Sequence, residues 1–278
     1  MSYLEQESKQ LQATGENPLL PGVKLPAGLS YTWDLDCVVG SDVVVMATPS
    51  FGVRSTAEQI AGRLSPGTVL VSVSKGIEKG TFLRMSQIIR EATGDRFPVV
   101  TLSGPSHAEE VARKVPTAVV SASPDRAAAE QVQDLLPQRP LPRLQQQRRG
   151  GGRAGGRPEN VMALCTGCCT GMGYGDNTKA MLMTRGLAEM ARLGVALGGW
   201  RETFAGLAGM GDLIVTCTSM NSRNYRAGIL IGQGVPVPEA IAKIGAVVEA
   251  TTPLSPPAPG PEGGHRDAHR PGRLRGAL

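Results

Sequence analysis

The sequence predicts an α/β domain, in which helices cover both faces of a parallel sheet, followed by an all-helical domain. Three observations lead to this fold class. Short apolar runs alternate with helix-forming segments through residues 37–136, which is typical of a parallel sheet with crossover helices. From Asn160 the chain is rich in small residues with helical spacing. A length of 278 residues also ordinarily provides two domains.

The strands of the predicted sheet are short apolar runs, as expected for strands that are buried on both faces. They are expected at residues 42–48, 68–73, 98–102 and 116–121. The helices between them are expected at residues 55–64, 82–92, from about 106 onward and at 124–136. Ser106 and Glu109 have the spacing of a capping box at the start of the third helix.

Residues 137–158 interrupt this pattern. They contain six Arg, four Pro and five Gly but no acidic residue, so they offer too little apolar surface to offset the entropy of ordering them. We therefore expect an aberrant Arg/Gly/Pro-rich linker over residues 137–159. Residues 251–278, with six Pro and five Gly, are expected to form a disordered tail.

The helical domain is expected over residues 160–250. Its clearest helix spans about residues 177–197, and Gly198 would end it. One face of this helix carries apolar side chains, namely Met183, Leu187, Met190 and Ala191. Shorter helices are expected at residues 201–207, 224–232 and 238–244.

Charge and composition argue against several classes of protein. The net charge is +5, but residues 137–158 and 251–278 together supply +8, which leaves −3 for the rest of the chain. A basic nucleic-acid-binding face on the folded part is therefore not expected. No apolar run reaches the roughly 18 residues of a membrane span. The polar start and five cysteines, an odd number, favour the cytoplasm.

Polar residues follow the predicted strands at their carboxyl ends, where open parallel sheets bind ligands. Lys75 follows the second strand and could neutralise an anion. Gly104 follows the third and permits close backbone approach, while Ser106 can donate or accept a hydrogen bond. Alone, Lys75 would be a solvated lysine and Ser106 a helix cap. Together, these strand ends favour a ligand site.

The stretch from Gly209 to Asn224 combines two chemical signals. Asp212 provides a carboxylate after a glycine-rich turn, and Arg223 lies where a new helix is expected to begin. A forked guanidinium and the free N–H groups of a helix start both suit a phosphate dianion. The stretch therefore indicates an enzyme that acts on a small phosphorylated alcohol or ketone. A surface loop with an ordinary capped helix is the alternative.

Several motifs, in this order along the chain, resemble those of the bacterial, cytoplasmic NAD(P)-dependent glycerol-3-phosphate dehydrogenases. The similarity covers about residues 16–136 and 160–250. The motifs are Glu16-Asn-Pro-Leu-Leu-Pro-Gly-Val-Lys-Leu-Pro26, Val73-Ser-Lys-Gly-Ile-Glu78, Leu102-Ser-Gly-Pro-Ser-His-Ala-Glu-Glu110, Gly173-Tyr-Gly-Asp-Asn177, Thr184-Arg-Gly-Leu-Ala-Glu-Met190 and the stretch from Gly209 to Asn224.

The resemblance implies a Rossmann-type dinucleotide-binding domain followed by an all-α substrate domain, in a homodimer. It also implies NAD or NADP as cofactor and a small phosphorylated substrate. The reaction would interconvert glycerol 3-phosphate and dihydroxyacetone phosphate by hydride transfer and so supply a precursor of glycerophospholipids. No nucleic acid or membrane partner is implied.

The resemblance also assigns residues to the site by motif. The implied substrate-binding residues are Lys75, Gly104, Ser106, Asp212, Ser222, Arg223 and Asn224. The implied cofactor-binding residues are Lys75, Ala108, Arg223, Val247 and Glu249.

The chain departs from the family pattern in two functional places. The family opens with a strand and a Gly-x-Gly-x-x-Gly loop that binds pyrophosphate, and the resemblance begins well past them. We therefore expect a dinucleotide-binding domain, residues 1–136, that is truncated and lacks this strand and loop. The family's catalytic lysine follows Gly-Gly-Ala-Leu, whereas Gly155-Gly-Arg-Pro-Glu-Asn-Val161 places Glu159 there. A carboxylate puts a negative charge beside the substrate, so no intact catalytic residue is expected.

Other interpretations stay open. Residues 137–158 and 251–278 are hypothesised to be out-of-frame translations, which resequencing of the gene would test. The chain could then be an inactive remnant that retains part of the fold, or the Arg-rich segment could bind nucleic acid. Cys165 and Cys168 form a CxxC without further ligands at metal-site spacing, so we expect them to be structural.

Overall fold

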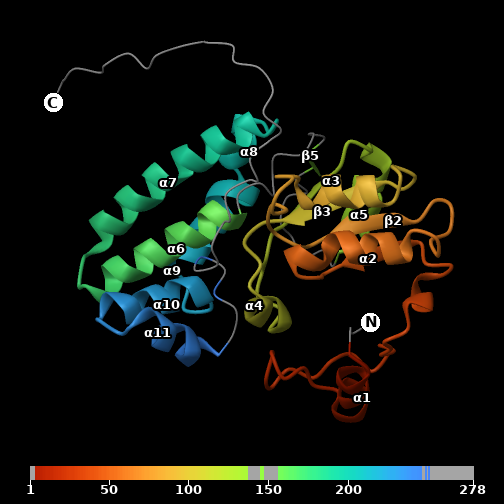
Figure 1. Ribbon diagram of the computed structural model, residues 1–278, viewed down its shortest axis with the longest axis horizontal. Coiled ribbons are helices and arrows are strands. Elements are labelled where there is room, and N and C mark those ends of the chain that lie inside the picture. Colours follow the sequence, from red (N-terminus) through yellow and green to blue (C-terminus); the bar gives the residue numbers. More distant parts are fainter. Residues whose placement is uncertain (1–3, 137–144, 147–155, 246–247, 249, 251–278) are drawn as a thin grey trace, which may run out of the picture.

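The computed structural model describes residues 4–136, 145–146, 156–245, 248 and 250. Figure 1 shows two lobes, one built around a sheet with helices beside it and one made of helices alone. The expected tail, residues 251–278, and most of the expected linker lie outside the described residues. The two-lobed arrangement agrees with the fold class that the sequence predicts.

The sheet has the order β1-β2-β3-β4-β5. The strands are β1 (Val43–Met46), β2 (Val69–Ser72), β3 (Val99–Ser103), β4 (Val120–Ala122) and β5 (Gln145–Gln146). The first three are parallel, with Val44 opposite Leu70 and Leu70 opposite Val99. Their carboxyl ends therefore lie along one edge of the sheet, as predicted.

Two features of the sheet differ from the prediction. Strand β4 is antiparallel to β3, because the chain between them contains only the five-residue helix α4 (Ala108–Ala112), and a parallel return needs a longer crossover. Strand β5 pairs with β4, although it lies within the segment predicted to be a linker. Backbone pairing does not require the apolar side chains that this segment lacks.

Helices cover both faces of the sheet, and alternate residues of the strands contact them. Leu70 packs in one core cluster with helices α2 (Val53–Ile60) and α3 (Met85–Ala92). Its neighbours Val69 and Val71 pack in a second cluster with α5 (Arg126–Leu135). Because side chains alternate along a strand, this pattern confirms the predicted doubly wound arrangement. An additional helix, α1 (Glu5–Thr14), precedes the sheet and was not predicted.

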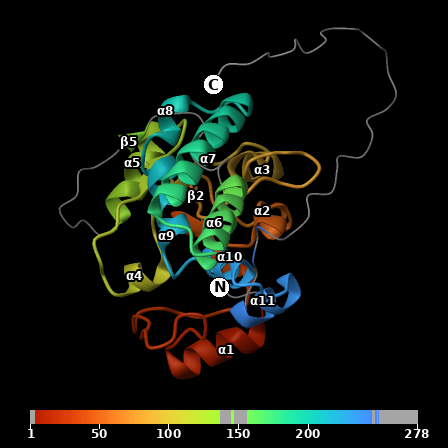
Figure 2. The same ribbon diagram turned by 90° about the vertical axis from the view of Figure 1, so that its left-hand side faces the viewer.

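The second lobe consists of seven helical segments among the described residues. They are α6 (Gly156–Gly171), α7 (Asp176–Ala196), α8 (Arg201–Phe204), the π-helical turn η3 (Leu207–Gly211), α9 (Asp212–Thr218), α10 (Arg223–Gly232) and α11 (Val237–Ile244). In the perpendicular view, α6 and α7 form the side of the molecule nearest the viewer (Figure 2). In the part of the chain with described positions, no helix combines the length and apolarity needed to cross a membrane.

The predicted face of α7 is confirmed, since Met190 is buried and Met183, Leu187 and Ala191 pack beside it in the core of the helical lobe. One helix boundary and one additional helix differ from the prediction. Helix α6 begins at Gly156, so residues 156–159 belong to the helical lobe and not to a linker. Helix α9 was not predicted, because the glycine-rich turn before it gives no helical signal.

Glycines allow α6 and α10 to pack in close contact. A Cβ on Gly167 or Gly171 of α6 would overlap backbone oxygens of α10, and a Cβ on Gly228 or Gly232 would overlap backbone oxygens of α6. Each pair has the Gly-x-x-x-Gly spacing of one helix face. Gly167 faces Gly228, and Gly171 faces Gly232. The two helices therefore run side by side in the same direction. The start of α10 therefore lies beside the part of α6 around Asn160.

Candidate functional site

The site lies where the strand ends of the sheet meet the N-terminal ends of α6, α9 and α10. Lys75 follows β2 and comes from the sheet lobe. The Ser74 hydroxyl donates a 2.5 Å hydrogen bond to the carbonyl oxygen of Thr48, which ties the end of β2 to the end of β1. Gly76 has a φ of 130°, and a Cβ there would lie 3.1 Å from Cβ of Ser50. The turn after Lys75 therefore needs glycine.

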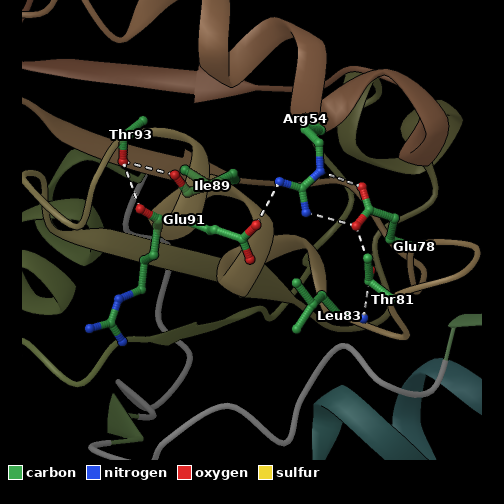
Figure 3. Close-up of polar contacts among 8 residues, drawn as sticks. Arg54, Glu78, Thr81, Leu83, Ile89, Glu91 and Thr93 are labelled. Carbon is green, nitrogen blue, oxygen red and sulfur yellow. Dashed lines mark hydrogen bonds and ion pairs between the residues drawn. The ribbon is translucent and has the colours of Figure 1, made fainter. Parts of the chain in front are cut away.

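The loop that follows Lys75 is anchored by a bidentate ion pair (Figure 3). Arg54 donates from Nε and Nη2 to both carboxylate oxygens of Glu78, each at 2.8 Å, and from Nη1 to Glu91 at 3.0 Å. The Thr81 hydroxyl adds a 2.5 Å hydrogen bond to Glu78. The hydrogen bonds from Arg54 are the main cause that holds the pKa of Glu78 below its usual value. This network fixes the loop to α2 and α3.

Lys75 bridges the two lobes through two acidic side chains of the helical lobe. Its Nζ lies 2.5 Å from Oδ2 of Asp212, the first residue of α9, and 3.5 Å from Oε1 of Glu159 in α6. Both acidic side chains are only 4% exposed, whereas Lys75 is 35% exposed. The structure therefore brings together Lys75 and Asp212, two residues to which the resemblance assigns substrate binding. The direct contact with Glu159 was not predicted.

Glu159 is buried, and its carboxyl group has a pKa close to neutral pH. Thr216 of α9 donates a 2.6 Å hydrogen bond to Oε1 of Glu159. Burial is the main reason that the pKa of Glu159 is raised to about 7. The charge of Asp212 raises this pKa further, whereas Lys75 and Thr216 lower it, and each of these effects is smaller than that of burial. Burial also raises the pKa of the neighbouring Cys217 thiol to about 12, which keeps this thiol neutral. The site therefore contains one acidic group that can exchange a proton near pH 7.

The start of α10 lies beside the start of α6. The Asn224 side chain donates to the Asn160 side-chain oxygen at 2.9 Å and accepts from the backbone N–H of Ala250 at 3.1 Å. Ser222 is the N-cap of α10, and its hydroxyl accepts from the backbone N–H of Tyr225 at 3.3 Å. Its buried hydroxyl therefore caps the helix. Sequence reasoning did not identify Asn160, whose partner is 64 residues away.

Arg223 is the exposed first residue of α10. Within the described ranges, its guanidinium makes no hydrogen bond or ion pair. A free forked donor at a helix start retains its full capacity to bind an anion. The structure thus places Arg223 where the sequence predicts it, next to Asn224 and with its donors available.

The loop after β3 approaches the same region. Gly104 is buried with a φ of 140°, and a Cβ there would lie 2.9 Å from the Ala118 carbonyl oxygen, so glycine is required. A Cβ on Gly211 would lie 3.6 Å from Pro105, which brings this loop against the turn before Asp212. Ser106 and Ala108 are exposed beside it.

The predicted capping box at Ser106 is wrong. The N-cap of α4 is His107, and the Ser106 hydroxyl instead donates to the Gly104 carbonyl oxygen at 3.2 Å. The tight turn at Gly104 directs the serine hydroxyl back toward its own loop and away from the helix. Two expected cofactor-binding residues, Val247 and Glu249, lie outside the described residues.

Three buried polar atoms at or just after the strand ends have no hydrogen-bond partner among the described residues. They are the Thr48 hydroxyl, after β1, the Ser72 hydroxyl, at the end of β2, and Nε2 of His107, at the start of α4 after β3. Buried polar atoms are rarely left without a partner in proteins, so each indicates a place for a ligand or water. Their positions after strands were the only sequence signal that could have identified them.

The arrangement combines two chemical capacities. Arg223 and the α10 N-terminus provide donors for an anion, while the partly exposed Lys75 and the buried Asp212 and Glu159 form a cluster suited to polar groups and proton transfer. Of the cysteines in α6, Cys165 is exposed, and Cys168 and Cys169 are half-buried. A small ligand with an anionic group at one end and an alcohol or carbonyl at the other would match these features.

Comparison with known families matches nearly the whole chain. Residues 1–129 match the model described as NAD-dependent glycerol-3-phosphate dehydrogenase N-terminus, and residues 150–255 match the corresponding C-terminus. The first match therefore begins at residue 1, earlier than the similarity noted from Glu16. The second includes residues 150–159 of the segment predicted to be a linker.

Individual relatives and a solved structure agree with these family models. The glycerol-3-phosphate dehydrogenase [NAD(P)+] of Desulfitobacterium hafniense is 48% identical, over 86% of this chain and 67% of the relative. The Moorella thermoacetica protein of the same name is 52% identical, over 86% of this chain and 71% of the relative. The crystal structure of glycerol-3-phosphate dehydrogenase from Coxiella burnetii superimposes with a TM-score of 0.83 at 34% identity, covering 90% of this chain and 77% of that one.

Proposed function

Because this chain belongs to the NAD-dependent glycerol-3-phosphate dehydrogenase family, we propose that it interconverts glycerol 3-phosphate and dihydroxyacetone phosphate with NAD or NADP. The observation that carries this proposal is the contact of Lys75 with Asp212. It joins the sheet lobe to the helical lobe beside the helix start that carries Arg223, whose guanidinium makes no hydrogen bond or ion pair within the described part of the chain. This position suits a small phosphorylated substrate held between the two lobes.

The substrate would be oriented by its charged end. In our proposal Arg223 binds the phosphate, assisted by Asn224 and the backbone N–H groups that open α10. The alcohol or carbonyl end would then point to Lys75 and Asp212. Support comes from the exposed position of Arg223 and from the Asn160–Asn224 hydrogen bond, which places the start of α10 next to the residues around Glu159. A forked donor and a helix start both favour a phosphate dianion.

The cofactor would be held along the strand ends. The proposed contacts in the described chain are Lys75, Ala108 and Arg223, and a bound nicotinamide would supply or accept the hydride. The Thr48 hydroxyl and His107 Nε2 fit this assignment, because both are buried polar atoms that follow strands of the sheet and have no partner among the described residues. The same donors suit NAD and NADP alike. Titrating each cofactor separately would measure the preference.

The proposed function can be tested by the oxidation of NADH or NADPH in the presence of dihydroxyacetone phosphate. Oxidation that depends on this ketone and on the purified full chain is expected, but it should be slow, because Glu159 stands where the family has its catalytic lysine. Dihydroxyacetone, which lacks the phosphate, serves as the matched control and is expected to be a far poorer substrate. Turnover that is absent, or equal for the two ketones, would contradict the proposed function.

A further inference from the structure

Glu159 brings an additional negative charge into a site that is proposed to bind a phosphate. Lys75 contacts both Asp212 and Glu159, so one cation faces two carboxyl groups. When Glu159 is ionised, these three groups carry a formal charge of −1, and when Glu159 is protonated they are neutral. Their electrostatic effect on an anionic ligand therefore depends on a single proton.

We propose that Glu159 determines the affinity of the site for phosphate-bearing ligands, which bind with proton uptake by its carboxylate. The inference deepens the proposed function and rests on it. The proton comes from solvent and is added to a carboxylate oxygen of Glu159. No covalent bond of the ligand changes, and the substrate class is a small alcohol or ketone carrying a phosphate dianion.

The surroundings of Glu159 explain why this group, and not a neighbour, would take the proton. Lys75 and Asp212 form the shorter ion pair, at 2.5 Å. Glu159 lies farther from the cation, at 3.5 Å, and its other identified partner is the neutral Thr216 hydroxyl. Its pKa of about 7, raised mainly by burial, places the exchange near neutral pH.

The other elements packed on this part of α6 contribute few charges. Cys217 of α9 has a neutral thiol near Glu159, since its own pKa is about 12. Helix α7 faces α6 through Gly186, against the apolar side chain of Met162. Helix α10 contributes the neutral Asn224 and, at its exposed start, the proposed phosphate ligand Arg223.

The direction of the pH effect follows from the charges. Ionised Glu159 repels a dianion, so a bound phosphate raises the proton affinity of Glu159, and by linkage protonated Glu159 raises the affinity for phosphate. Above about pH 7 a phosphate monoester is already a dianion, because its second pKa is about 6. Any loss of affinity above this pH therefore comes from the protein and not from the ligand.

Isothermal titration of glycerol 3-phosphate into the full chain from about pH 7 to about pH 9 tests the inference. The dissociation constant of the unaltered protein is expected to rise about tenfold over this range, with proton uptake visible as a heat that depends on the buffer. Glu159→Gln, which is neutral and similar in shape, should bind more tightly at high pH and change less than about twofold. Glu58→Gln, an exposed site on α2, should behave like the unaltered protein.

A second variant tests the inference independently, in case Glu159→Gln does not fold. Thr216→Val removes the donor that lowers the pKa of Glu159, so it should move the loss of affinity to higher pH. An unchanged pH dependence in Glu159→Gln, or no displacement in Thr216→Val, would overturn the inference while leaving the proposed function intact. If neither the unaltered protein nor any variant bound glycerol 3-phosphate at any pH, both the proposed function and this inference would be contradicted.

Discussion

The Nζ atom of Lys75 lies 2.5 Å from Oδ2 of Asp212, and this contact joins a loop of the sheet lobe to the first residue of α9. In the sequence, the part of the sheet lobe that follows β2 and the helices α6, α7 and α8 lie between these two residues. Their meeting places a cation and a carboxylate between the lobes. We infer that this pair organises both the lobe interface and the substrate end of the site.

Replacement of Lys75 by methionine should weaken both folding and binding. Asp212 would lose its cation while remaining 4% exposed, which should cost about 1–3 kcal/mol of unfolding free energy. Urea unfolding and glycerol 3-phosphate titration would measure the two effects. Lys79→Met, in the exposed part of the same loop, is the matched control. Equal stability of the two variants would show that the Lys75–Asp212 pair does not stabilise the lobe interface.

The glycine contact of α6 and α10 should tolerate no added methyl group. In Gly228→Ala the new Cβ would overlap the Leu164 carbonyl oxygen, so the helices must separate, at a cost of about 1–3 kcal/mol. Guanidinium unfolding would measure this loss. Gly62→Ala is the control, because nothing lies within 4 Å of its added Cβ. A loss in Gly228→Ala no larger than in Gly62→Ala would contradict the described packing.

The Arg54–Glu78 pair should stabilise the protein in a pH-dependent way. Because the pKa of folded Glu78 is lowered, mainly by the hydrogen bonds from Arg54, the stabilisation is present above the usual pKa of glutamate and disappears as pH falls through the lowered value. Arg54→Met should therefore cost about 1–2 kcal/mol near neutral pH and less in acid. Chemical unfolding at several pH values would show this, whereas a cost that is constant with pH would argue against it.

Glu159 should have the opposite effect on stability. Its folded pKa is raised, so its favourable contribution is present below the unfolded pKa, near 4.5, and is lost as pH rises through about 7. Glu159→Gln should therefore become more stable than the unaltered protein above pH 7, by about 2–3 kcal/mol. Thermal melts at acidic and mildly alkaline pH would compare them. A stability difference that does not grow with pH would contradict the assigned pKa.

Much of the fold could be predicted because the relevant patterns are local. Apolar runs indicated the strands, and the spacing of Met183, Leu187 and Met190 indicated the buried face of α7. The direction of β4 could not be predicted, because it depends on how the chain returns beside β3. The start of α6 was not predicted, because Gly and Pro residues disfavour a helix in isolation. Here packing against α10 stabilises the helix.

The candidate site was predictable to a similar extent. Lys75, Asp212 and Arg223 were identified from residue chemistry and from the family resemblance, although their roles remain proposals. The contact of Lys75 with Glu159 spans 84 positions, and no periodicity or spacing could show it. The sequence also indicated an ionised Glu159, whereas burial, which only the folded structure shows, moves its pKa to about 7.

In the proposed function, Arg223 recognises the phosphate of a three-carbon substrate during NAD(P)-dependent turnover. The most direct test compares kcat/KM for dihydroxyacetone phosphate and dihydroxyacetone in the unaltered chain and in Arg223→Ala, with the exposed Arg192→Ala on α7 as control. We expect Arg223→Ala to lower kcat/KM for the phosphorylated ketone by about 100-fold and to leave that for dihydroxyacetone nearly unchanged. No turnover of dihydroxyacetone phosphate by the unaltered chain, or equal loss for both ketones, would contradict the claim.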